Sequence, residues 1–288
     1  MSKPKILVQL DPDPQASVFD AVVAVDSDVD HLLQHHSVSL DQVTGLVHGA
    51  MFTRGPADLH NTAVFIGGSD VAAGEAILKK TTEAFFGPIR VSVMLDASGA
   101  NTTAAAAVVA AGRHLDLSST RALVLAATGP VGQRVVRLLA NAGGYVKVAS
   151  RSLGRAQELV EKISDTVPGA KLHAVETQSS ADLQEALAGV DLVVSAGAAG
   201  IELLPNDARA KSDLKVAIDL NAVPPLGIGG IEVMDAAKDV SGQICYGAIG
   251  VGGTKMKIHK AAIRRIFESN DCVLDIDEIY QLGLSLEK

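Results

Sequence analysis

The stretch LVLAATGPVG, residues 123–132, joins a short apolar run to the start of an amphipathic segment. An apolar strand that ends in a glycine-containing turn and continues into a helix is typical of the first unit of a dinucleotide-binding domain. In that pattern Gly129 lets the backbone approach a pyrophosphate, and Gly132 allows the helix to pack closely. Ala127 replaces the first glycine, so we expect a residue with a Cβ to make the tight turn. The predicted cofactor contacts here are Thr128, Gly129, Pro130, Val131 and Gly132.

On both sides of this stretch, short β-branched runs alternate with longer helical patterns. The predicted strands are 5–10, 62–66, 90–95, 122–126, 145–149, 172–175, 192–195 and 216–220, and the predicted helices are 71–85, 101–114, 131–142, 155–166 and 180–187, with further helices closing the chain. This alternation indicates an α/β protein of two domains, each with a mainly parallel sheet, the second of the Rossmann type. The polar segment 116–120 predicts the boundary, giving a first domain over 1–115 and a Rossmann domain over 116–254.

The composition excludes several classes of protein. The 288 residues include 25 Lys plus Arg against 33 Asp plus Glu, a formal charge of −8, which argues against a nucleic-acid partner. The two cysteines form no CxxC pair, so we expect neither a disulfide framework nor a metal site. No apolar run is long enough for a signal peptide or a membrane span, which predicts a soluble cytoplasmic protein without membrane partners.

The ends of three further predicted strands indicate which dinucleotide binds. NAD enzymes usually place an acidic residue after the second strand of the domain, but this chain has Ser150, Arg151 and Ser152 there. A guanidinium with flanking hydroxyls suits a 2′-phosphate, and we expect no carboxylate nearby to repel one, so NADP is favoured. The structural alternative is a solvated loop arginine. Further along the same predicted edge we expect cofactor contacts from Ala196, Gly197 and Asn221.

The glycine-rich segment 247–253 precedes a helical pattern. Thr254 resembles an N-cap, which would place Lys255 and Lys257 in the first helical turn, where the dipole disfavours cations. Lys255 and His259 would share one face of this helix. The pattern suggests an anionic or electron-rich ligand, and the alternative is a pair of solvated lysines with a surface histidine.

Several longer stretches together resemble a known family: GGSD (67–70), FFGP (85–88), MLD (94–96), GANTTAAA (99–106), TGPVG (128–132), NAVPPLGIGGI (221–231), FES (267–269) and EIY (278–280). They are similar to the NAD(P)-dependent methylene-tetrahydromethanopterin dehydrogenases and the related methylene-tetrahydrofolate dehydrogenases of one-carbon-metabolising bacteria. The resemblance implies a pterin domain completed by C-terminal helices over 255–288, and a homo-oligomer, either trimer or hexamer. It also implies that Lys255 is catalytic, and that pterin contacts come from Asp96, Asn101, Thr102 and Lys255.

Two positions depart from the family pattern. A family member has glycine at the position of Ala127, and lysine at the position of Ser152. The loss of one cation near the 2′-phosphate site indicates NADP use together with NAD activity. Three other readings stay open: an NADP-dependent enzyme of the shikimate or amino-acid dehydrogenase type, a non-enzymatic NADP sensor, and a cyclohydrolase-type pterin enzyme. The first would need a Lys–Asp pair that the sequence does not locate.

Overall fold

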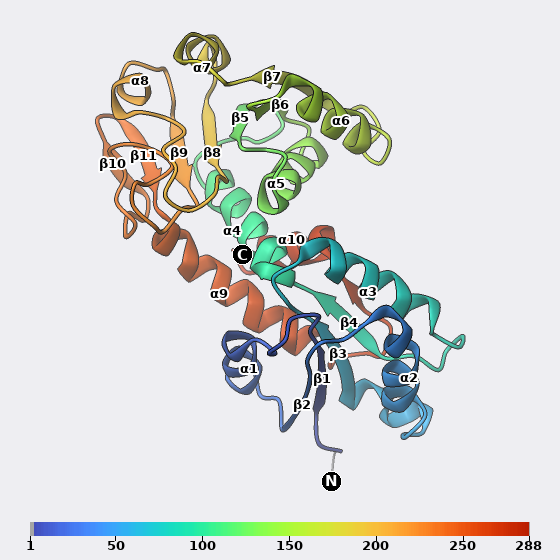
Figure 1. Cartoon of the computed structure of the whole chain (residues 1–288). Coiled ribbons are helices and arrows are strands. Elements are labelled where there is room, and N and C mark those ends of the chain that lie inside the picture. The colour runs from blue at the N-terminus through green and yellow to red at the C-terminus, as the bar shows by residue number, and fades with distance from the viewer. Residues whose placement is uncertain (1–2, 288) are drawn as a thin grey trace. The chain divides into compact units, whose positions relative to one another are not determined.

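The chain folds as two compact units in a computed structural model that describes residues 3–287 (Figure 1). One unit is formed by Met1–Thr102 and Met256–Lys288, and the other by Thr103–Lys255. The chain passes from one unit to the other inside two helices, α4 (Ala100–Gly112) and α9 (Ala248–Arg265). The first of these crossings lies before the polar segment 116–120. The composition of the sequence does not mark it, because the helix continues unbroken from one unit into the other.

The first unit has a five-stranded, fully parallel sheet in the order β12-β4-β3-β1-β2. Its strands are β1 (Ile6–Leu10), β2 (His31–His35), β3 (Thr62–Ile66), β4 (Ser92–Leu95) and β12 (Val273–Leu274). Its other helices are α1 (Val18–Val25), α2 (Leu40–Met51), α3 (Val71–Glu83) and α10 (Ile276–Ser285), with short 3₁₀ turns at Pro56–Asn61 and Ala97–Gly99. Every residue of β3 and β4 is buried, as expected for parallel strands covered on both faces.

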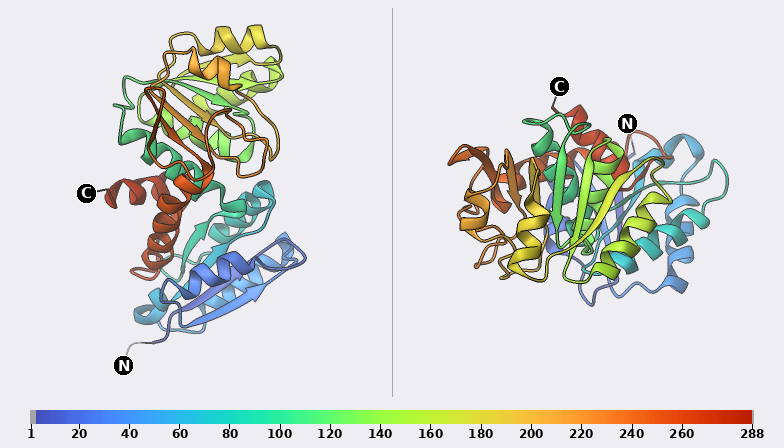
Figure 2. Two further views of the ribbon diagram at one scale, coloured as in Figure 1. Left: turned by 90° about the vertical axis from the view of Figure 1, so that its left-hand side faces the viewer. Right: turned by 90° about the horizontal axis from the view of Figure 1, so that it is seen from above.

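The C-terminal part of α9 belongs to the first unit, where it packs with N-terminal elements that are distant from it in the sequence. The left view of Figure 2 shows the red C-terminal helices beside the blue N-terminal elements. Lys260 of α9 pairs with Asp26 at 2.8 Å, and Arg264 pairs with Asp28 at 2.9 Å. Because these pairs are partly exposed, each contributes little to stability, and the buried apolar residues of α9, such as Ile258 and Ile263, hold the helix in place.

The second unit has a seven-stranded sheet in the order β10-β11-β9-β8-β5-β6-β7. Its strands are β5 (Arg121–Leu125), β6 (Tyr145–Ser150), β7 (Lys171–Glu176), β8 (Leu192–Ser195), β9 (Val216–Asp219), β10 (Lys238–Val240) and β11 (Gln243–Tyr246). Only the β10–β11 pair is antiparallel. The helices are α5 (Pro130–Asn141), α6 (Leu153–Ser164), α7 (Ser180–Leu187) and α8 (Asn206–Ala210). Figure 1 shows α5 and α6 beside the β5–β6–β7 half of the sheet.

This strand order confirms the predicted α/β class and the Rossmann type of the second domain. The prediction missed β2, α1, α2, α8, β10, β11 and β12. The edge strand β2 has no continuous buried face, so its sequence HLLQH carries neither an apolar run nor an alternating pattern. The expectation that only helices close the chain is wrong, because β10, β11 and β12 extend the sheets there.

The predicted start of the C-terminal helix is also wrong. Helix α9 begins at Ala248, so Thr254 is not its N-cap and Lys255 lies well inside the helix. The glycines 247 and 250 allow this, since a Cβ on Gly250 would lie 1.8 Å from the carbonyl oxygen of Asp235. Thr254 instead accepts a hydrogen bond from the Arg113 guanidinium at 3.1 Å. Lys255 therefore does not lie in the first helical turn, where the helix dipole would disfavour its charge.

Candidate functional site

The strand order of the second sheet places the candidate cofactor site. From β5 the sheet grows through β6 and β7 on one side, and then through β8 and β9 on the other side, so the strand order reverses between β5 and β8. Ligands of open α/β sheets bind at the carboxyl ends of the strands at such a point. The turn 126–129 leaves β5, and the segment 196–200 leaves β8. The peptide N–H of Ala196 donates to the carbonyl of Leu125 at 3.1 Å, so these two strand ends lie side by side.

The turn after β5 leaves space at one glycine and none at the other. A Cβ on Gly132 would lie 2.7 Å from the Ala126 carbonyl oxygen and 2.8 Å from the Ala127 Cα, so only glycine fits there. At Gly129 the nearest atoms would be 3.4 and 3.8 Å away, an ordinary contact distance. Gly129 is the N-cap of α5, whose first-turn N–H groups have no intrahelical acceptors. The turn therefore presents backbone donors beside a residue without a side chain, which fits a pyrophosphate.

The strained position in this turn differs from the predicted one. Ala127 is fully buried and its N–H donates to Ala149 of β6 at 2.9 Å, so this residue is still held by the sheet. The bend falls one residue earlier, on Ala126, whose φ is +52°. An L-residue in this left-handed region is strained by its Cβ, whereas glycine would not be.

The end of β6 presents the three residues predicted to contact the 2′-phosphate. Ser150 is buried and its Oγ accepts from the N–H of Ser152 at 3.3 Å. Arg151 and Ser152 are exposed, and Ser152 is the N-cap of α6 without a side-chain capping bond. The expectation that no carboxylate stands nearby is wrong. Glu176, at the end of β7, accepts from the N-terminal N–H of α6 at Leu153, with a distance of 3.3 Å.

The loops after β8 and β9 are built around one buried carboxylate, Asp219. Its oxygens accept from the N–H groups of Asn221 at 3.1 Å and Ile228 at 2.9 Å. Burial raises the pKa of this carboxyl above its ordinary value, and the hydrogen bonds from backbone N–H groups oppose that shift. A Cβ on Gly227 would lie 2.3 Å from the Ser195 Oγ, so this glycine is required by the packing of the loop.

Two predicted cofactor residues in these loops also have internal structural roles. The side chain of Asn221 is buried, donates to the Pro225 carbonyl at 3.1 Å and accepts from the Val223 N–H at 2.9 Å. A Cβ on Gly197 would lie 2.6 Å from the Leu203 side chain. Both residues therefore shape the loops that border the edge of the sheet.

In the first unit, three residues predicted to bind substrate come together where β4 ends. Asp96 accepts from the Thr102 N–H at 3.0 Å and from the Thr102 Oγ1 at 2.6 Å. Asn101 donates to the Leu95 carbonyl at 2.7 Å and to Asp275, the N-cap of α10, at 2.9 Å. All three side chains are buried, so in this structure they organise the strand end and the start of α4.

The structure places His259 in this buried group, so the alternative of a surface histidine is wrong. Its Nδ1 lies 3.8 Å from the Asp96 Oδ2, and its ring stacks on Phe65 with centroids 5.8 Å apart. The buried carboxylate of Asp11, at the end of β1, was also missed; it accepts from the N–H groups of Asp13 and Ser17. The position of an acidic residue directly after a buried strand is the signal that could have identified Asp11.

The predicted catalytic lysine lies on α9. Lys255 is half-buried and Lys257 is exposed, so the structure distinguishes the two lysines in burial. Lys255 and His259 are one helical turn apart on the same face of α9, as the sequence predicted from their spacing.

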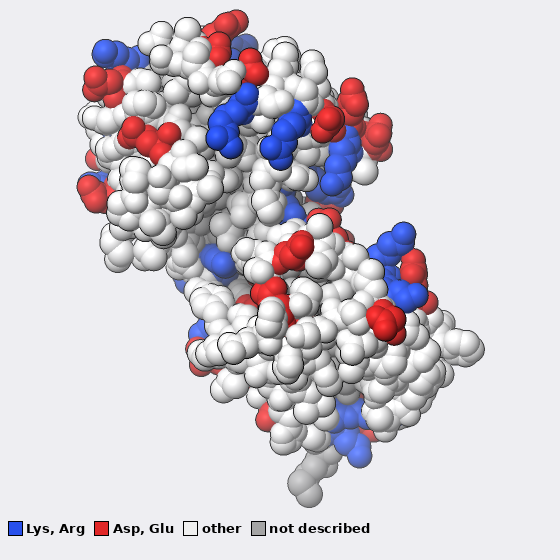
Figure 3. All heavy atoms as spheres, in the orientation of Figure 1, with Lys and Arg blue, Asp and Glu red and all other residues white. Residues whose placement is uncertain are grey.

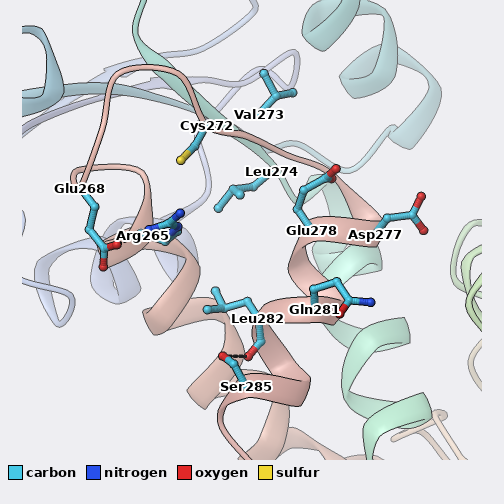
Figure 4. Close-up of a pocket in the computed structure, with 10 residues that line it drawn as sticks. All are labelled: Arg265, Glu268, Cys272, Val273, Leu274, Asp277, Glu278, Gln281, Leu282 and Ser285. Carbon is cyan, nitrogen blue, oxygen red and sulfur yellow. Dashed lines mark hydrogen bonds and ion pairs between the residues drawn. The ribbon is translucent and has the colours of Figure 1, made fainter.

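Two cavities lie elsewhere in the units. One cavity, of about 650 Å³, lies in the first unit next to β12 and α10, and Figure 4 shows the residues that line it. Its lining includes the carboxylates of Glu268, Asp277 and Glu278, while Arg265 pairs with Glu268, so it does not suit a phosphate. The second cavity, of about 540 Å³, lies where β5, β6 and β7 begin, at the opposite edge of the sheet from the turn 126–129. Its Lys147 donates to the Ala186 and Ala188 carbonyls at the end of α7.

Three further properties of the described residues concern surface charge, metal ligands and membrane helices. Figure 3 shows Lys and Arg scattered among Asp and Glu on the face drawn, without an extended basic region. Within residues 3–287, no group of three or more His, Cys, Asp or Glu is placed to hold a metal ion. In the same range, no helix is both long and apolar enough to cross a membrane.

Comparisons with known proteins match each unit to a family model and nearly the whole chain to two relatives. Residues 18–98 match the family described as methylene-tetrahydromethanopterin dehydrogenase, N-terminal, and residues 126–271 match an NAD(P)H-binding family. The chain is 44% identical to the bifunctional protein MdtA of Methylorubrum extorquens, over 98% of this chain and 99% of the relative. It is 29% identical to the NAD(P)-dependent methylenetetrahydromethanopterin dehydrogenase of the same organism, over 98% of both chains.

A solved structure shares the fold at low sequence identity. Shikimate 5-dehydrogenase from Listeria monocytogenes has a TM-score of 0.54 and 14% identity, covering 98% of this chain and 96% of that one. At this identity the likeness concerns the fold alone, whereas the relatives at 44% and 29% match nearly the whole chain. The chain therefore belongs to the methylene-tetrahydromethanopterin dehydrogenase family and is an NAD(P)-dependent dehydrogenase with a Rossmann-type domain.

Proposed function

We propose that this enzyme oxidises methylene-tetrahydromethanopterin to the methenyl form with NADP, and that it also accepts NAD. One observation carries the proposal: the two matched families fall on different parts of the chain, a methylene-tetrahydromethanopterin dehydrogenase N-terminal region over 18–98 and an NAD(P)H-binding region over 126–271. The relatives named above supply the substrate class. Methylene-tetrahydrofolate is the second substrate to compare, since the two reduced pterins carry the same reacting methylene bridge.

The second unit would hold the dinucleotide. The backbone of residues 128–132 would bind the pyrophosphate, and Arg151, with Ser150 and Ser152, would bind the adenosine ribose and its 2′-phosphate. Ala196 and Gly197 would border the cofactor where β8 ends. Bound NADP or NAD would supply the hydride acceptor. Asn221 would act through the shape of its loop, because its amide is already engaged there.

The first unit would hold the pterin. The buried group of Asp96, Asn101 and Thr102 would fix the strand end against which the ring is placed. Oxidation of a methylene carbon to a methenyl cation by loss of hydride removes no proton, so this step needs no general base. The protein would then act mainly by aligning donor and acceptor.

Lys255 is proposed to act on the pterin. A charged ammonium beside a developing cation would be unfavourable, so this lysine would orient the pterin or act as the neutral amine. Its half-buried position on α9, in contrast to the exposed Lys257, supports a role for this lysine in particular.

A single absorbance assay tests the proposal. Purified enzyme is mixed with NADP or NAD and with methylene-tetrahydromethanopterin, methylene-tetrahydrofolate or shikimate, and the NADH or NADPH band is followed. We expect turnover with methylene-tetrahydromethanopterin and none with shikimate. Turnover with shikimate alone, or cofactor binding without turnover on either pterin, would refute the proposal. We further propose a homo-oligomer, trimer or hexamer, which light scattering of the purified protein can test.

A further inference from the structure

The carboxylate of Glu176 lies at the point where the proposed 2′-phosphate site is built. Glu176 is the last residue of β7 and pairs in register with Ser150, the last residue of β6. The N–H of Thr177 donates to the Ser150 carbonyl at 3.0 Å, which keeps the two strand ends together. From there the Glu176 Oε1 accepts from the N–H of Leu153 at 3.3 Å, at the first residue of α6.

This contact places a negative charge at a helix N-terminus, where anions are favoured. The first N–H groups of a helix lack intrahelical acceptors, and the helix dipole adds positive potential there. The N-cap residue Ser152 makes no side-chain capping bond, and the first turn contains no acidic residue. Glu176 is thus the anion that the protein itself supplies to α6.

The same position is also where a bound 2′-phosphate would gain most. Arg151 immediately precedes the N-cap and Arg155 lies in the first turn of α6, so two cations accompany the helix N-terminus. A phosphate monoester carries a charge of roughly −1.5 to −2 at neutral pH. A ribose 2′-hydroxyl carries none, so repulsion by Glu176 would act on NADP and not on NAD.

We propose that Glu176 is a specificity-determining residue that competes with the 2′-phosphate of NADP for the N-terminus of α6, and so shifts the enzyme toward NAD. This inference rests on the proposed function, because it requires the adenosine ribose to lie at the end of β6. The carboxylate weakens the preference that Arg151 creates. The ratio of NADP to NAD affinity is then set by two opposing charges on adjacent strand ends.

Glu176→Gln is the direct test, because glutamine keeps a carbonyl acceptor for the Leu153 N–H and removes only the charge. The dissociation constants of NADP and NAD are measured by calorimetry at low and high salt. We expect NADP to bind about two- to fivefold more tightly in the variant, as for one exposed like-charge contact, and the affinity for NAD to stay nearly unchanged. Because the effect is electrostatic, it should shrink at high salt.

Glu158→Gln is the matched control, since Glu158 is an exposed carboxylate farther along α6 and its loss changes the net charge equally. We expect it to leave both affinities unchanged. An unchanged NADP to NAD ratio in Glu176→Gln, a change equal to that of the control, or an effect insensitive to salt would overturn the inference while the proposed function stands. If the unmodified enzyme bound neither cofactor, the proposed function would fail and this inference with it.

Discussion

Two single-methyl substitutions in the turn after β5 should have different effects, one mainly on stability and the other mainly on cofactor binding. In Gly132→Ala the new Cβ would lie 2.7 Å from the Ala126 carbonyl oxygen and 2.8 Å from both the Ala127 Cα and its carbonyl oxygen. Unstrained carbon contacts lie at about 3.5–4.0 Å. In Gly129→Ala the nearest atoms are at 3.4 and 3.8 Å, so the methyl fits and points into the space proposed for the pyrophosphate.

The magnitudes follow from these contacts. All three atoms that Gly132→Ala would meet are backbone, so we expect the upper end of an overpacking cost, about 3 kcal/mol. Alanine regains up to about 1 kcal/mol over glycine inside a helix, which leaves a net loss of about 2 kcal/mol in the free energy of unfolding. Gly129→Ala should lose only about 0.5–1 kcal/mol, because glycine is the better N-cap. The NADP affinity of this variant should fall roughly 10- to 100-fold, because the added methyl group would clash with the bound pyrophosphate at a cost similar to that of overpacking in a protein core.

Two measurements separate the variants. Urea unfolding followed by circular dichroism reports the transition midpoint, and the fluorescence of added NADPH reports cofactor binding. We expect the midpoint to fall mainly for Gly132→Ala and the affinity of a well-folded protein to fall for Gly129→Ala. A wild-type midpoint in Gly132→Ala would refute the close packing of α5 on its turn. Normal NADP binding by Gly129→Ala would show that the pyrophosphate does not approach this backbone.

Three further predictions concern single positions. Arg151→Ala should weaken NADP binding by about 1.5 kcal/mol, the lower range for a charged hydrogen bond at an exposed site, and leave NAD nearly unchanged; equal losses in titrations of both cofactors would remove Arg151 from this role. Lys255→Ala should lower kcat by about tenfold or more, roughly 1.4 kcal/mol in the barrier, with NADP affinity unchanged, whereas Lys257→Ala should have little effect; steady-state kinetics showing the reverse ranking would contradict the assignment. Ala126→Gly should raise the free energy of unfolding by roughly 0.5–1 kcal/mol, because relief of left-handed strain exceeds the added entropy of the unfolded chain; a lower urea midpoint would contradict the strained turn.

Local patterns in the sequence determined the repeating units of this fold. The mainly apolar runs predicted at 62–66, 192–195 and 216–220 correspond to the buried strands β3, β8 and β9, because parallel strands covered on both faces favour near-continuous apolar sequences. The turn at 128–132 could be located for a similar reason, since glycine is needed where backbone and helix approach closely. Each of these features depends on neighbours within a few residues along the chain.

Only the tertiary structure decided which distant groups meet. Glu176 reaches the N-terminus of α6 through the pairing of β6 with β7, and no spacing in the sequence encodes that contact. His259 is buried beside Asp96 because α9 packs in the first unit, whereas its spacing in the sequence predicted only that it shares a helix face with Lys255. The start of α9 at Ala248 depends on the carbonyls of residues 233 and 235, which accept from the N–H groups at its N-terminus. Side-chain spacing can predict a helix, but where it begins depends on hydrogen-bond partners supplied by another segment of the chain.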